Sequence, residues 1–150
     1  MKWLKKQAEL YPQKTFLNDF TFEQINQRVD KIARHLAPLV AKKTRVALLS
    51  ENSVEMAVLL FALLGLSKEI LLLNTHLTTY ELTEQVNELE IDRVFSSDLL
   101  KEKMTDSISF SDILATTAEP VSLSVNFPDE KIAVIMNTSA VSYTHLTLPT

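Results

Sequence analysis

Residues 45–74 read RVALLSENSVEMAVLLFALLGLSKEILLLN, and this stretch decides the fold class. It begins and ends with short apolar runs, which predict strands over 45–50 and 70–74. Runs with so little alternation are typical of parallel strands that are covered on both faces. The residues between them predict a helix over 53–66, with Asn52 as its N-terminal cap. This helix is apolar nearly all round, which indicates burial on more than one face.

Upstream of this unit, a capping box predicts the start of a long helix. Thr21 and Gln24 are spaced so that each side chain can bond the other residue's backbone N–H. Apolar residues then recur at three- and four-residue spacing, so we predict a helix over 21–37. Pro38 disfavours helical continuation, and the helix is therefore expected to end or kink near it.

Downstream, the same signal recurs at Thr78 and Glu81 and predicts a helix over 78–89. A further apolar run predicts a strand over 93–96. Strands and helices therefore alternate along the chain. This order predicts an α/β fold with a mostly parallel sheet and right-handed crossovers.

The remaining third of the chain has weaker patterns. We predict a short helix over 99–104, a short strand over 108–110 and a helical turn over 111–114 that is capped by Ser111. Residues 116–129 are rich in Ser, Thr and Pro and are typical of a loop. The run KIAVIMN, residues 131–137, predicts another buried strand.

Composition excludes several classes of protein. The chain has 150 residues, a net charge of -4, no cysteine and a single glycine. Mild acidity argues against nucleic-acid binding, which needs clustered Lys and Arg. The missing cysteines exclude a disulfide scaffold, a thiolate zinc site and a cysteine nucleophile. The longest apolar run, residues 56–66, is about half of the roughly 20 residues that a membrane span needs. The N-terminus carries Glu9 and is not a signal peptide.

Three segments in this order and spacing resemble the N-terminal region of the adenylate-forming enzymes. They are FTFEQIN at 20–26, RVALLSENS at 45–53 and LNTHLT at 73–78. The resemblance covers about residues 1–139. That superfamily includes acyl-CoA and aryl-CoA ligases, luciferases and the adenylation domains of nonribosomal peptide synthetases. It implies that the chain is the N-terminal part of a large α/β domain, incomplete as given.

The short N-terminus, with Trp3 and Leu4 close to its start, resembles the subgroup that ligates 2-succinylbenzoate to CoA in menaquinone biosynthesis. In such enzymes a carboxylate attacks the α-phosphorus of ATP, giving an acyl-adenylate and pyrophosphate. The thiol of CoA then displaces AMP to give the thioester. The resemblance thus implies ATP, Mg²⁺ and CoA as cofactors, a small carboxylic acid as partner and a cytoplasmic location. Another acid–CoA ligase or an adenylation domain of the same superfamily is the alternative.

Thr138 and Ser139 are the residues that match a binding motif of this family. They follow the predicted strand at 131–137, where family members carry a glycine-rich loop and a lysine that bind the ATP phosphates. The resemblance implies that both hydroxyls donate to the β- and γ-phosphates of ATP. The alternative is an ordinary strand end, where Ser and Thr bond the nearby backbone. No catalytic residue and no metal ligand are expected among these 150 residues.

The family pattern stops after Ser139. Ala140 stands where glycine is usual, and the last ten residues, VSYTHLTLPT at 141–150, contain neither glycine nor lysine. We interpret residues 1–140 as a partial AMP-binding domain and residues 141–150 as a non-native tail that resembles translated adapter sequence. On this interpretation the chain alone is inactive and binds no cofactor well. The alternative is a genuine C-terminal strand, rich in residues of high strand propensity, in a non-catalytic binding module.

The histidines and paired acids do not form a further site. His35 is expected at the solvated edge of its helix, and His145 lies in the suspect tail. His76 lies in the loop before a helix start, where a functional role and a plain loop position both fit. No acid lies at metal-ligand spacing from these histidines. Glu84 and Glu88 are interpreted as part of a solvated helix face.

Overall fold

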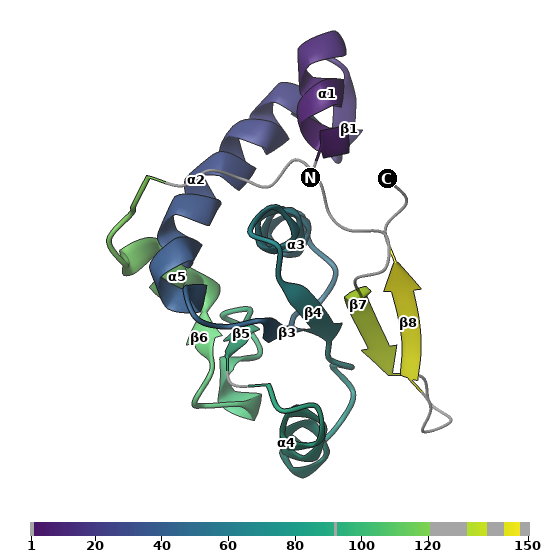
Figure 1. Cartoon of the computed structure of the whole chain (residues 1–150), viewed down its shortest axis with the longest axis vertical. Helices are drawn as coiled ribbons and strands as arrows, with labels where there is room; N and C mark the ends of the chain where they lie inside the picture. Colours follow the sequence, from purple (N-terminus) through teal and green to yellow (C-terminus); the bar gives the residue numbers. More distant parts are fainter. Residues whose placement is uncertain (1, 92, 121–131, 138–142, 148–150) are drawn as a thin grey trace.

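The computed structural model describes residues 2–91, 93–120, 132–137 and 143–147 (Figure 1). In chain order its elements are α1 (Lys2–Leu10), β1 (Thr15–Leu17), β2 (Phe20–Thr21), α2 (Phe22–Val40), β3 (Arg45–Leu49), α3 (Val54–Gly65), β4 (Glu69–Leu72), α4 (Thr79–Glu88), β5 (Val94–Ser96), the 3-10 turn η1 (Lys101–Lys103), β6 (Ile108–Ser109), α5 (Phe110–Ala115), β7 (Ile132–Asn137) and β8 (Tyr143–Thr147).

A six-stranded sheet organises the described part of the chain. Its order is β6-β5-β3-β4-β7-β8, and the first five strands are parallel. Only β8 is antiparallel, to its neighbour β7. A small antiparallel hairpin of β1 and β2 precedes α2. The predicted α/β class with a mostly parallel sheet is confirmed.

The central strands are buried on both faces because successive side chains point to opposite sides of a strand. Val46, Leu48 and Ile70 join a core under α2 and α3, whereas Ala47 and Leu71 join a second core under α4. Figure 1 shows α2 and α3 on one side of the sheet and α4 on the other. The prediction that the apolar helix α3 is buried on more than one face is also confirmed.

Two predicted helix starts are confirmed, and one is displaced by a residue. Thr21 and Thr78 form complete capping boxes with the residues three positions later. At α3, however, the cap is Ser53, whose Oγ accepts from the backbone N–H of Met56 at 3.1 Å. The prediction of Asn52 as cap is wrong because the extended residue that begins the helix lies one position later.

Helix α2 continues through Pro38 and ends two residues later at Val40, beyond the predicted end at residue 37. A proline here has no N–H to donate to the carbonyl of Arg34, four residues earlier. In the structure that carbonyl accepts from the backbone N–H of Glu119 at 3.0 Å. The segment after α5 therefore supplies the missing partner and satisfies the carbonyl that proline would otherwise leave unbonded.

The region around β6 also differs from prediction. Helix α5 is capped by Ser109, whose Oγ accepts from Asp112 N at 3.1 Å, and not by Ser111. The predicted helix at 99–104 is a single 3-10 turn. The strand predicted at 131–137 is β7, whereas residues 121–129 of the predicted loop lie outside the described residues.

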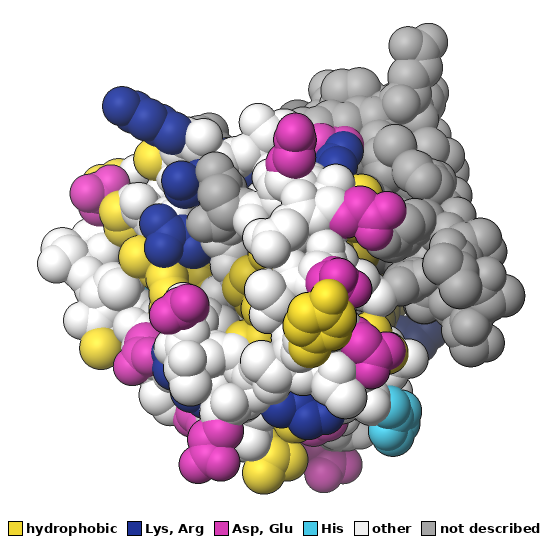
Figure 2. Space-filling view, turned by 90° about the horizontal axis from the view of Figure 1, so that it is seen from below, with side chains coloured by type: hydrophobic (Ala, Val, Ile, Leu, Met, Phe, Trp, Pro, Cys, Tyr) yellow, Lys and Arg dark blue, Asp and Glu magenta, His cyan; other side chains and the backbone are white. Residues whose placement is uncertain are grey.

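Neither the described helices nor the face shown in Figure 2 points to a membrane or to a strongly charged partner. No helix in the described ranges is long and apolar enough to cross a membrane. Figure 2 shows the molecule from the α4 side of Figure 1, with acidic and basic side chains interspersed.

Removing the cap of α4 is expected to destabilise the fold by a measurable amount. The Thr78 hydroxyl accepts from Glu81 N at 3.2 Å, and Glu81 Oε1 accepts from Thr78 N at 3.3 Å. Thr78→Ala should lower the free energy of unfolding by about 1 kcal/mol, measured by urea denaturation. Thr79→Ala, at the next exposed position, is the control and should change it by less than about 0.5 kcal/mol. Equal values for the two variants would contradict the cap.

Candidate functional site at the carboxyl edge of the sheet

The carboxyl ends of the parallel strands meet at one edge of the sheet, and the loops there diverge. Strand β3 is followed by α3 on one face, whereas its neighbour β4 is followed by α4 on the opposite face. In open α/β sheets, ligands bind where neighbouring connections part in this way. This edge is therefore the candidate site.

The loop after β4, residues 73–78, is held by hydrogen bonds to its backbone N–H and carbonyl groups. Asn74 Oδ1 accepts from His76 N at 2.9 Å, and the carbonyl of Asn74 accepts from Leu77 N at 3.2 Å. From the turn after β5, Lys103 Nζ donates to the carbonyls of Thr75 at 2.5 Å and Leu77 at 3.2 Å. One ammonium group thus ties two loops of the edge together.

The loops after β3 and β5 are joined by a second set of bonds. Ser97 Oγ donates to Glu51 Oε2 at 2.8 Å, and Ser97 N donates to the carbonyl of Leu49 at 2.9 Å. The hydroxyls of the neighbouring Ser96 and of Ser107 pair at 2.7 Å in a buried position. Because these groups already satisfy one another, this half of the edge is a support rather than a place for a ligand.

Asp98 extends this support to the start of α5. Its carboxylate accepts from the backbone N–H of Ser111 at 3.1 Å and from the Ser111 hydroxyl. Both bonds favour the ionised form, so the Ser111 hydroxyl first and its amide second lower the pKa of Asp98.

This lowered pKa predicts a pH-dependent contribution to stability. A carboxyl group whose pKa is lower in the folded state stabilises the fold above its ordinary pKa, and the contribution is lost as the pH falls through the lowered value. We therefore expect Asp98→Asn to be less stable than the parent at neutral pH, with the difference shrinking below about pH 4. Thermal unfolding of both proteins across this range tests it. A difference that does not change with pH would contradict an ionic role.

The residues predicted to bind phosphate, Thr138 and Ser139, lie outside the described residues. The strand that leads to them is described. Met136 of β7 pairs in parallel with Leu72 of β4, so β7 ends at the candidate edge, beside the loop that begins at Leu73. The prediction for the two hydroxyls stays a prediction.

The histidines are placed apart. His76 is exposed in the loop after β4. His35 is half-buried, and its Nδ1 lies 2.8 Å from the carbonyl of Thr116, so the prediction of a solvated side chain is wrong. The side chain of His145 lies outside the described residues. Among the residues that the structure does describe, no three His, Asp or Glu side chains are grouped so as to hold a metal ion.

Sequence reasoning missed Lys103, and no local pattern could have revealed its reach across 26 residues to the loop after β4. Removing its charge should loosen that loop. Hydrogen bonds from a charged donor contribute about 1.5–3 kcal/mol, so we expect Lys103→Met to lower the free energy of unfolding by about 2 kcal/mol in urea denaturation. Lys42→Met, at an exposed lysine in another turn, should have almost no effect. Similar losses in both variants would contradict the clamp.

Comparison with known proteins agrees with this geometry. The family model described as AMP-binding enzyme matches residues 4–144. Over 142 residues, 95% of this chain and 32% of the relative, the chain is 75% identical to the 2-succinylbenzoate–CoA ligase of Lactococcus lactis. The chain thus spans about a third of the length of the curated relatives that it matches.

Among solved structures, the chain resembles the unliganded o-succinylbenzoate coenzyme A synthetase of Bacillus subtilis. The TM-score is 0.87 at 24% identity, and the match covers 97% of this chain and 33% of the other. The same Bacillus subtilis enzyme in complex with ATP and magnesium ion matches with a TM-score of 0.80 at 22% identity, over 97% of this chain and 42% of the other. At these identities the likeness supports the fold.

Proposed function

This chain belongs to the family of AMP-binding enzymes, and from that premise we propose that it forms the N-terminal part of an ATP-dependent acid–CoA ligase. The whole enzyme would convert acid and ATP into an acyl-adenylate and pyrophosphate. CoA would then displace AMP to give the acyl-CoA. We further propose 2-succinylbenzoate as the acid, and hence a role in menaquinone biosynthesis.

One observation carries the choice of substrate. The chain shares 75% of its residues with the Lactococcus lactis ligase over 95% of its own length. The geometry adds that β4 and β7 end side by side at the edge where a parallel α/β sheet binds ligands. The proposed compartment is the cytoplasm, where ATP and CoA are supplied.

Thr138 and Ser139 have the proposed role of donating hydrogen bonds to the β- and γ-phosphates of ATP. In the sequence they come directly after β7, whose carboxyl end lies at the candidate edge. Within the described ranges no acidic or histidine cluster fits a magnesium ion. From the resemblance to the family we propose that the magnesium and adenine ligands lie beyond residue 140. Bound magnesium would neutralise phosphate charge during adenylation.

Residues 1–140 are proposed to be a partial AMP-binding domain, and residues 141–150 a tail foreign to it. The glycines and lysine expected after Ser139 are missing, although the family match runs on to residue 144. Strand β8 pairs with β7, but a Thr-rich peptide adds to an open strand edge whatever its origin. Sequencing the source gene across the codon for Ala140 tests this. Glycine and lysine codons in a continuing frame support the proposal, and a stop codon after Thr150 contradicts it.

The pairing of β8 is also the observation that favours the second candidate, a non-catalytic α/β binding module. Such a module needs residues 141–150 to pack. We expect their deletion to leave the melting temperature unchanged. A clear fall in melting temperature would favour the module.

A graft tests the proposed function directly. Residues 1–137 of this chain would replace the matching part of the Lactococcus lactis ligase. The unaltered Lactococcus lactis ligase would be the control. We expect the graft to form the CoA thioester of 2-succinylbenzoate within about tenfold of the parent rate. A folded but inactive graft would contradict the proposal.

The 150-residue chain by itself is expected to be inactive, because the proposed adenine and magnesium ligands lie beyond it. Acid-dependent exchange of pyrophosphate into ATP by the purified chain measures adenylation. Detectable exchange would contradict this expectation.

A further inference from the structure

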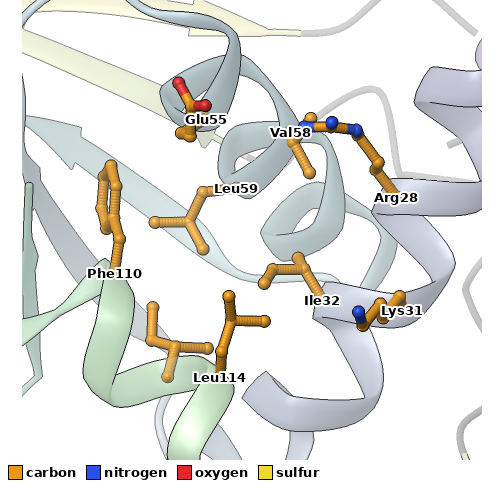
Figure 3. Close-up of a pocket in the computed structure, with 9 residues that line it drawn as sticks. Arg28, Lys31, Ile32, Glu55, Val58, Leu59, Phe110 and Leu114 are labelled. Atoms are coloured by element: carbon orange, nitrogen blue, oxygen red, sulfur yellow. The ribbon is translucent and has the colours of Figure 1, made fainter.

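A hollow of about 350 Å³ opens in the helical layer between α2, α3 and α5. Six apolar side chains line it: Ile32, Val58, Leu59, Phe110, Ile113 and Leu114. Figure 3 shows Phe110 and Leu59 facing Ile32 and Leu114 across it. A volume near the lower end of the roughly 300–1,000 Å³ range suits a small molecule rather than a nucleotide or CoA.

The polar lining is unequal in charge. Arg28 and Lys31 lie three residues apart on α2 and therefore share a face of it, whereas Glu55 comes from α3. In the part of the chain that the structure describes, none of the three has an ion-pair partner within 4 Å. The Arg28 guanidinium lies 4.3 Å from the centre of the Phe20 ring. Two cations and one carboxylate give the lining a net positive charge.

A second hollow adjoins the first and shares these two cations. It has a volume of about 250 Å³ and is also lined by Phe20, Gln24 and Gln27. The side-chain amides of Gln24 and Gln27 therefore lie on one side of the two cations, and the six apolar side chains of the first hollow lie on the other. A ligand that spans this boundary needs an anionic head and an apolar body.

We propose that the hollow between α2, α3 and α5 binds a small carboxylic acid, with its carboxylate at Arg28 and Lys31 and its apolar body against Leu59 and Phe110. A guanidinium group matches the two oxygens of a carboxylate. The apolar wall gains from every methylene that it removes from water. The proposal does not depend on the proposed ligase activity, because none of the side chains that form the hydrogen bonds described at the candidate edge lines the hollow.

Octanoate and its uncharged analogue octanamide test the site in the 150-residue chain by methyl NMR. We expect octanoate to shift the methyl signals of Ile32, Leu59 and Leu114 and to bind about threefold to tenfold more tightly than octanamide, the range given by two exposed ion pairs. Equal affinities, or shifts confined to other methyl groups, would overturn the proposal.

Variants separate the charge from the apolar wall. The double variant Arg28→Gln, Lys31→Gln should reduce octanoate affinity to that of octanamide. The matched double variant Lys5→Gln, Lys6→Gln on α1 should leave it unchanged. Leu114→Trp should fill the hollow and abolish binding of both ligands. Since all five positions are exposed, the variants should keep the parent melting temperature.

The full-length gene product gives a second readout, with its active site blocked by a non-hydrolysable acyl-adenylate analogue. Octanoate binding that survives the block and is lost in the Arg28, Lys31 variant supports the site. Binding abolished by the block alone would overturn it, whether or not the protein is a ligase.

Discussion

Replacing Phe95 by alanine is expected to lower the free energy of unfolding by about 3–5 kcal/mol, the usual loss for a fully buried phenylalanine. Phe95 is the largest side chain that the described core buries completely. It lies on β5, between Leu48 of β3 and Ile108 of β6. The cavity left in the core under α2 and α3 would face side chains that relax only partly. Because domains are stable by only about 5–15 kcal/mol, this loss approaches the limit of folding.

Urea denaturation of the parent and the variant measures this loss. Leu99→Ala is the matched control, because Leu99 lies four residues further along and is 77% exposed. The control should change the free energy of unfolding by less than about 0.5 kcal/mol. A loss below about 1 kcal/mol in Phe95→Ala would contradict the described core.

The second large effect concerns the proposed phosphate contacts. In the full-length gene product, Thr138→Ala and Ser139→Ala are each expected to lower kcat about 10²–10³-fold, the usual loss when one aligned donor to a reacting group is removed. The KM for the acid should change little, because the two hydroxyls are proposed to touch ATP.

Steady-state kinetics with Thr79→Ala as control checks this expectation. Thr79 lies on the exposed surface of α4, and its replacement should leave kcat unchanged. If Thr138→Ala and Ser139→Ala both keep kcat within about twofold, they do not contact the phosphates.

The order of strands and helices could be predicted because each signal was local. The capping boxes at Thr21 and Thr78 and the buried runs of β3 and β4 depend on neighbouring residues only. The continuation of α2 past Pro38 could not be predicted in this way. The hydrogen-bond partner of the Arg34 carbonyl is Glu119, 85 positions further along the chain.

The short hairpin of β1 and β2 was not predicted, for a related reason. The hairpin of β1 and β2 has strands of three and two residues, too short for a period to emerge. Its turn places Asn18 at a φ of 50° without any glycine to signal it. Stacking of Phe16 on Phe22, with ring centres 4.6 Å apart, accompanies the hairpin in the structure.

For the candidate site, too, some features could be predicted from local sequence and others could not. The parallel order of the strands predicts which edge binds ligands, and the position of β7 beside β4 agrees with it. The roles of Thr138 and Ser139 came from resemblance to a family, since Thr and Ser at a strand end have no specific meaning by themselves. The contact of Lys103 with the loop after β4 joins residues 26 positions apart, so it could be found only in the structure.

Formation of a CoA thioester by the full-length protein that the source gene encodes tests the central claim most directly. The account predicts that 2-succinylbenzoate, ATP, Mg²⁺ and CoA together yield the thioester, with one AMP released per thioester, and that omission of any one abolishes it. A folded full-length protein that forms no thioester from 2-succinylbenzoate under these conditions would contradict the account.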